Sequence, residues 1–218
     1  MSLDLVNPHV TRILLAAENG DSINRIAEKA GGSYGWTHKW VERLEDVDVL
    51  KRDGGVHIED EAFVERFEAV AKTAFGRNVS LDDAYLLPNF SGLTYRYSHT
   101  DAVFVWTKGG YQIGRNQDDY PIFIDVYEDE LAEWTGFLDG FSMEYSVEDR
   151  IDGADIYFVL FPREEFESDW VENASVTPLD ETIAWMQEYE VNFQPALEML
   201  DEMYDLDLGV RYRERNVL

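Results

Sequence analysis

The chain has 218 residues and no cysteine, and it carries a formal net charge of −27 with 14% aromatic residues. The aromatic content is enough to build packed cores, which argues against intrinsic disorder, and the lack of cysteine excludes disulfides and thiol chemistry. No apolar run approaches the roughly 18 residues of a membrane helix and no signal peptide is visible, so we expect a cytoplasmic protein without membrane contact.

A helix is expected first, because Asn7-Pro8 offers a cap acceptor followed by proline at the first helical position. The helical pattern of apolar residues that follows ends at Gly20. A second helix is expected after Asp21-Ser22, and Gly31-Gly32 then makes a tight turn. Ser33 can cap a third helix.

This third helix, expected at about residues 33–46, has two contrasting sides. One sector should pack inward and consists of Trp36, Thr37, Trp40, Val41 and Leu44. A helical module of this kind can also dock proteins, and in that alternative Trp36 and Trp40 form a dimer contact instead of a core. The opposite sector is short, polar and partly basic, and it consists of Gly35, His38, Lys39, Glu42 and Arg43. A helix that lies in the major groove of DNA requires such a surface.

A strand-turn-strand pattern follows the third helix. Residues 47–52 and 56–58 flank Asp53-Gly54-Gly55, which is strong hairpin chemistry. Three helices and a hairpin in this order are typical of DNA-docking modules. We therefore predict DNA contacts from the exposed start and outer side of the third helix and from the basic hairpin strand, that is from Ser33, Tyr34, Gly35, His38, Lys39, Arg43, Lys51 and Arg52.

Residues 10–58 resemble the winged helix-turn-helix regulators of the MarR and ArsR type, with a small apolar helix, a turn and the closing segment Val41-Glu42-Arg43-Leu44-Glu45 before the hairpin. Asp48 stands where those families usually place glycine, so the resemblance does not predict the conformation of the turn into the hairpin. The resemblance covers about a quarter of the chain. It implies a transcriptional regulator that is not an enzyme, needs no cofactor and binds double-stranded DNA, and we expect a homodimer on a two-fold symmetric site.

The negative charge is unevenly distributed along the chain. Residues 1–58 carry nine acidic and seven basic residues, a net charge of −2, whereas the remainder carries −25. Arginine outnumbers lysine by 13 to five. Such acid-rich, lysine-poor sequences resemble proteins of salt-in halophiles, which implies a haloarchaeal type of regulator. In molar salt the Debye length is about 3 Å, so long-range repulsion between this protein and DNA is largely removed.

The remaining pattern predicts a second domain. An amphipathic helix at residues 60–75 ends at Gly76, and we place the boundary between domains 1–76 and 77–218 there. Further strands are expected at 102–106 and 111–113, which form a hairpin, and at 121–127 and 155–161; helices are expected at 128–138 and 177–209, the latter interrupted at 192–195. The expected fold class is α+β: a winged helix-turn-helix followed by a larger domain with a mainly antiparallel sheet, which serves an effector, a partner or dimerisation.

The second domain is similar to AbiEi-type antitoxin regulators in the order of its elements, which implies an alternative function as a protein-interaction module. Uncharacterised haloarchaeal winged-helix proteins resemble the chain in Tyr95-Arg96-Tyr97, in residues 105–111 and in residues 208–215. This second resemblance implies no particular activity.

Several carboxylates, histidines and aromatic residues have both a chemical and an ordinary structural interpretation. Asp125, Asp152 and Asp155 lie on or beside expected strands, where carboxylates can hold Mg²⁺ as in nucleotidyltransferases, but the Gly-Ser loop of such enzymes is missing. The four histidines have no zinc-ligand spacing. We therefore predict no catalytic residue and no metal site. An effector pocket is possible between Trp106, Tyr111, Arg115 and Tyr127, although sheet packing explains the same residues.

Overall fold

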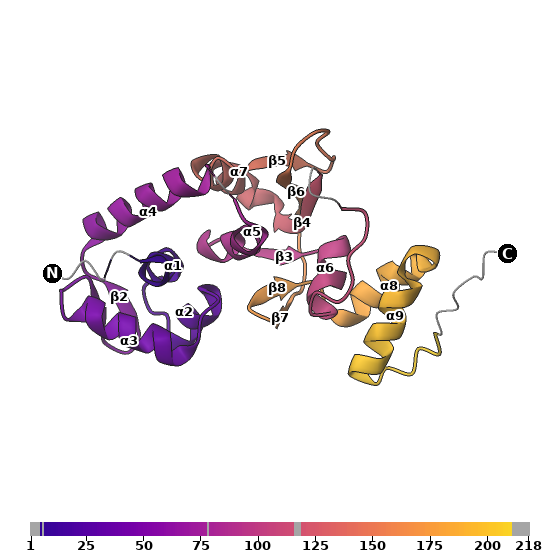
Figure 1. Ribbon diagram of the computed structural model, residues 1–218, viewed down its shortest axis with the longest axis horizontal. Helices are drawn as coiled ribbons and strands as arrows, with labels where there is room; N and C mark the ends of the chain where they lie inside the picture. The colour runs from indigo at the N-terminus through magenta and orange to yellow at the C-terminus, as the bar shows by residue number, and fades with distance from the viewer. Residues whose placement is uncertain (1–4, 6, 78, 116–118, 211–218) are drawn as a thin grey trace. The chain divides into compact units, whose positions relative to one another are not determined.

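The computed structural model describes residues 5, 7–77, 79–115 and 119–210, and the chain is a mixed α and β protein (Figure 1). This confirms the expected α+β class. The chain packs into two compact units, Met1–Leu93 with Ala132–Glu144 and Thr94–Leu131 with Tyr145–Leu218. The domain boundary expected after Gly76 stays a prediction, because compact packing does not tell which segments fold alone.

The first unit is mainly helical. Its elements are α1 (Pro8–Ala16), α2 (Ile23–Lys29), α3 (Tyr34–Glu45), β1 (Leu50–Arg52), β2 (Val56–Ile58), α4 (Glu61–Phe75), α5 (Leu81–Leu86), the 3₁₀ turn η2 (Leu87–Phe90) and almost all of α7 (Leu131–Gly140). Four of its helices, α1, α2, α4 and α5, begin at side-chain caps. Asn7 Oδ1 accepts hydrogen bonds from the backbone of His9 and Val10, Ser22 Oγ caps α2 and Asp60 Oδ1 caps α4. These contacts satisfy backbone donors that have no partner inside the helix.

The hairpin expected after the third helix is present. Strands β1 and β2 pair antiparallel with Leu50 opposite Ile58, and Asp21 adds an isolated bridge to Val56. Gly54 in the turn has a φ of 72°. Asp48, just before the hairpin, has a φ of 58°, which lies in the left-handed region that glycine favours. The turn into the hairpin therefore has the backbone conformation that a glycine would adopt.

The core of the first unit comes from the helices and the hairpin together. Val10 of α1, Ile26 of α2, Val41 and Leu44 of α3 and Val56 of β2 are at most 1% exposed and belong to one cluster. Helix α4 lies against this cluster through partly buried Phe63, Val64 and Phe67, whereas Val70 is 68% exposed. The single apolar face expected along α4 is therefore covered only in part.

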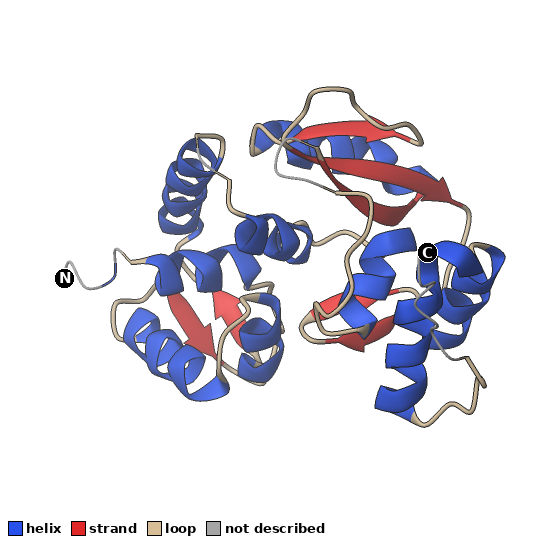
Figure 2. Cartoon of the chain, turned by 45° about the vertical axis from the view of Figure 1, so that its right-hand side comes forward, coloured by secondary structure: helices blue, strands red, loops and turns tan. Residues whose placement is uncertain are grey.

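The second unit is built on a six-stranded sheet (Figure 2). Its elements are β3 (Tyr95–Tyr97), α6 (His99–Trp106), β4 (Tyr120–Tyr127), the 3₁₀ turn η3 (Glu128–Glu130), β6 (Ile156–Arg163), β7 (Asp169–Val171), β8 (Ala174–Val176), α8 (Leu179–Glu188) and α9 (Glu190–Tyr204), while β5 (Glu144–Val147) begins at the junction of the units. The strand order is β5-β6-β4-β3-β8-β7.

The expectation of a mainly antiparallel sheet is wrong. The longest pairing, β4 with β6, is parallel over eight residue pairs, and β3 pairs with β8 in parallel as well. β3 pairs with β4 and β7 pairs with β8 in antiparallel fashion, so the sheet is mixed. The chain passes through α7 and β5 between β4 and β6, and a connection of that length allows the second strand to run in the same direction as the first.

The expected hairpin at residues 102–113 is also wrong, because residues 102–106 lie in helix α6. Ala102, Val103, Val105 and Trp106 are all buried, so their apolar run has no polar side that would reveal its period. Such short runs do not distinguish a buried strand from a buried helix.

The break expected at residues 192–195 lies elsewhere as well. Helix α8 ends at Glu188 and α9 begins at Glu190, whereas Pro195 stands inside α9.

Candidate nucleic-acid interface

Helix α3 buries one side and exposes the other. Thr37, Trp40, Val41 and Leu44 are buried, as the sequence predicts. Trp36, however, is 52% exposed, so its assignment to the core is wrong. It lies in the first turn of α3, and its ring stacks on His9 of α1 with centroids 5.3 Å apart. The buried face of the helix therefore begins at Thr37 and not at Trp36.

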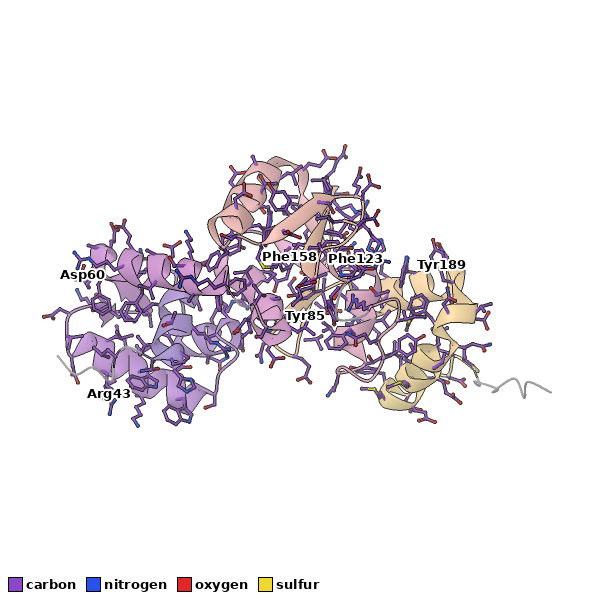
Figure 3. The ribbon with its side chains drawn as sticks, turned by 45° about the horizontal axis from the view of Figure 1, so that its top comes forward. Arg43, Asp60, Tyr85, Phe123, Phe158 and Tyr189 are labelled. Atoms are coloured by element: carbon purple, nitrogen blue, oxygen red, sulfur yellow. The ribbon has the colours of Figure 1, made fainter. Side chains whose placement is uncertain are left out.

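Two cations on α3 lie over aromatic rings. Lys39 Nζ is 5.0 Å from the centroid of the Trp36 ring, and the guanidinium carbon of Arg43 is 4.7 Å from that of Trp40. Figure 3 labels Arg43 on this helix. Neither cation has an ion pair or hydrogen bond among the described residues. Their charged ends can therefore be exchanged for another partner without breaking a salt bridge.

The first turn of α3 is open. Ser33 is the cap residue but makes no side-chain cap hydrogen bond. Tyr34 is 53% exposed, and its ring centroid is 5.8 Å from that of His38. A Cβ added at Gly35 would meet no atom within 4 Å, so this turn leaves room for an approaching surface.

The hairpin contributes one exposed cation and one paired cation. Lys51 is exposed on β1. Arg52 binds Glu45, with Nε 2.7 Å from Oε2, and its Nη1 lies 3.5 Å from His38 Nε2. The Arg52 hydrogen bonds hold the pKa of Glu45 below its ordinary value. This ion pair joins the end of α3 to the hairpin.

The structure thus brings together most of the residues that the sequence singled out, on α3 and the hairpin of the first unit. His9 and Trp36 stack beside these residues; the sequence did not single out His9 for this surface, and it assigned Trp36 to the core or to a dimer contact. The position of His9 directly after Pro8 at a helix start is the signal that it lies at an open end.

The carboxylates considered for a metal are not gathered in one place. Asp125 is 2% exposed and bonds to Arg96, whereas Asp152 and Asp155 are exposed. Within the ranges that the structure describes, no group of three or more histidine, aspartate or glutamate residues is placed to hold a metal ion.

The residues considered for an effector pocket have separate contacts. Trp106 Nε1 donates to the carbonyl of Thr177, Arg115 binds Asp101, and the ring of Tyr127 lies against Phe166. Their burial follows from ordinary packing in the second unit.

Comparison with known proteins gives no relative: no family model, curated protein or solved structure matches the chain. Among the described residues, no helix is both long and apolar enough to cross a membrane. Any proposal of function therefore rests on the site itself.

Proposed function

We propose that the chain is a DNA-binding transcriptional regulator of the winged helix-turn-helix type. In this proposal α3 lies in the major groove and the hairpin β1–β2 contacts the backbone. The order of three helices and a hairpin supports it, because that order presents the third helix to DNA in known modules. A helix of 12 residues is about 18 Å long and fits the groove.

The observation that carries the proposal is that Lys39 and Arg43 have no carboxylate partner among the described residues. The chain contains 45 acidic residues, yet both cations lie on the outer part of α3 over aromatic rings and without a carboxylate partner among the described residues. Cations that are already paired lose that partner when they bind phosphate or guanine. Lys39 and Arg43 have no such loss, which suits them to contact DNA.

The total charge of −27 opposes this function in dilute buffer. In molar KCl the Debye length is about 3 Å, so only charges at the interface count. We propose a homodimer, because two copies of one recognition helix match a two-fold symmetric site.

The test is fluorescence anisotropy in molar KCl, with a labelled DNA fragment selected from a genomic pool and a scrambled fragment of equal composition. Lys39→Ala and Arg43→Ala should each weaken specific binding by about 1–3 kcal/mol if the residue reads a base. Arg66→Ala, an exposed change on α4, is the matched control and should bind as the parent does. Unchanged affinity in both α3 variants would refute the assignment.

A protein-interaction module is the second candidate. Tyr34 and Trp36 are both more than half exposed on α3, and exposed aromatic residues are frequent anchors of protein interfaces. This function predicts no preference between the selected and the scrambled DNA, together with a copurifying protein that Trp36→Ala releases.

A further inference from the structure

A cluster of charged side chains lies inside the second unit. Arg96 on β3 and Asp125 on β4 are register partners, and they are only 6% and 2% exposed. Arg96 Nε donates to Asp125 Oδ2 over 2.8 Å. Phe123, labelled in Figure 3, lies two residues before Asp125 on β4 and therefore on the same face of the sheet. Buried charges of this kind need partners, because they have lost their contact with water.

Arg96 has further acceptors. Its terminal nitrogens donate to both carboxylate oxygens of Glu181 on α8, over 2.7 and 2.8 Å, and to the carbonyl of Glu167. Burial alone would lower the pKa of Arg96, but the hydrogen bonds to Glu181 and Asp125 outweigh it and raise the pKa. Arg96 is therefore a fixed positive charge whose position is set by three segments of the chain.

Asp125 is less well satisfied than Arg96. Its Oδ1 atom is buried and has no hydrogen-bond partner, although Arg163 Nε lies 3.5 Å away. A buried acceptor that lacks a donor is destabilising, because it has lost its hydrogen bonds to water. Asp125 Oδ1 can therefore accept one more hydrogen bond.

Arg163, at the end of β6, is the movable member of the cluster. Its side chain is 43% exposed and lies near the Phe161 ring. Its terminal nitrogens have no hydrogen-bond partner among the described residues. Arg163 can thus turn toward an anionic group without breaking a hydrogen bond, at the loss of its ion pair with Asp125.

These side chains line a cavity of about 120 Å³. That volume holds several water molecules or one small molecule. His99 and Trp185 form part of its wall, with ring centroids 5.5 Å apart. His99 has a φ of 51°, a strained conformation that often marks functional sites. Burial lowers the pKa of His99 below its ordinary value, with smaller contributions from Arg163 and Arg96, although Asp125 acts in the opposite direction.

The charges decide what the cavity can accept. Asp125 and Glu181 balance Arg96 and Arg163, so the four groups sum to zero. If Arg163 turns to an anionic group, the other three retain one negative charge beside Asp125 Oδ1. A ligand ammonium group would neutralise that charge and supply the missing donor. A ligand that carries both charges therefore leaves each half of the site neutral.

We propose that this cavity binds a small zwitterion of the α-amino acid class, whose ammonium group donates to Asp125 Oδ1 and whose carboxylate binds the terminal nitrogens of Arg163. A charge-assisted pairing of guanidinium with carboxylate is among the stronger polar contacts. The proposal goes beyond DNA binding and does not depend on it, because the ligand can be measured on the protein alone.

The experiment is isothermal titration of the full chain with each common L-amino acid in turn. We expect at least one to bind with a dissociation constant below about 10 mM. For that amino acid, the amine that lacks the carboxylate and the 2-hydroxy acid that lacks the amine should each bind at least about tenfold more weakly.

Arg163→Gln should weaken binding by at least about tenfold. Arg150→Gln is the matched control, because Arg150 lies in the same unit and its side chain is similarly exposed, at 47%; it should leave binding unchanged. Both changes are at exposed side chains, so loss of folding is not expected. Absence of binding by every amino acid, or equal binding by Arg163→Gln and the parent protein, would overturn the proposal.

Discussion

The α3 surface of the first unit and the charged cavity of the second unit use arginine in opposite ways. Arg43 lies over the Trp40 ring and has no carboxylate partner among the described residues. Arg96 is almost fully buried and bonds to two carboxylates and a carbonyl. The first arrangement costs little to exchange for another partner. The second defines one geometry, because any change leaves a buried charge unpaired.

The comparison shows that, in a chain this acidic, charge alone does not identify a binding residue. On α3 the informative fact is that a cation lacks a partner. In the cavity it is that one buried carboxylate oxygen, Asp125 Oδ1, lacks a hydrogen-bond donor. In the first case an anionic partner is missing, and in the second a hydrogen-bond donor is missing. Each observation therefore indicates the kind of partner that would bind.

The largest expected effect is on Arg96. Arg96→Met should lower the free energy of unfolding by about 3–5 kcal/mol, because it leaves Asp125 and the Glu181 carboxylate without their buried counterion. Arg43→Met should cost less than about 1 kcal/mol, the usual value of an exposed cation–π contact. Urea denaturation followed by circular dichroism measures both. Similar losses in the two variants would contradict the contrast between the regions.

A second contrast lies within α3 itself. Leu44 is fully buried, so Leu44→Ala should cost about 2–5 kcal/mol of unfolding free energy. Trp36→Ala should stay within about 0.5 kcal/mol, because more than half of that side chain is already in solvent. The same denaturation experiment compares them. A large loss for Trp36→Ala would mean that this residue is covered in solution, as a dimer contact would do.

The smallest effect concerns His99 in the cavity. Because burial holds its pKa below 6.5 in the folded protein, the unfolded chain binds more protons than the folded one as pH falls below 6.5. The contribution of neutral His99 to the free energy of unfolding is therefore fully present above pH 6.5. It is lost on acidification, by no more than about 1.4 kcal/mol per pH unit. His99→Phe keeps the ring and removes the proton site, so its stability should fall less steeply than that of the parent. Parallel curves would exclude this role.

Local signals in the sequence predict much of the first unit. Asn7-Pro8 marks the start of α1, and Asp53-Gly54-Gly55 marks the hairpin turn, because caps and tight turns depend on residues close together in the chain. The same logic fails for Trp36, since whether a neighbour covers the first turn of α3 is decided by tertiary packing. It also fails for residues 102–106, where burial on all sides hides the helical period.

The charged cavity was beyond reach of local signals. Asp125 lies 29 residues from Arg96, and Glu181 lies 85 residues from it. The contacts between these residues depend on the register of β3 with β4 and on the position of α8. Local sequence patterns predict neither. One hint was present: a single charged residue stands in each of the apolar segments Tyr95-Arg96-Tyr97 and 121–127. Such residues are costly to bury and usually have a partner.

The ion pair between Arg52 and Glu45 has a consequence for how binding would respond to salt. A cation that neutralises a DNA phosphate releases condensed counterions, and this release makes binding weaken as salt rises. If Arg52 leaves Glu45 for a phosphate, the freed carboxylate takes up a cation from solution and offsets part of that release. Under the proposed function, the hairpin would thus contribute contact to DNA while adding little to its salt sensitivity.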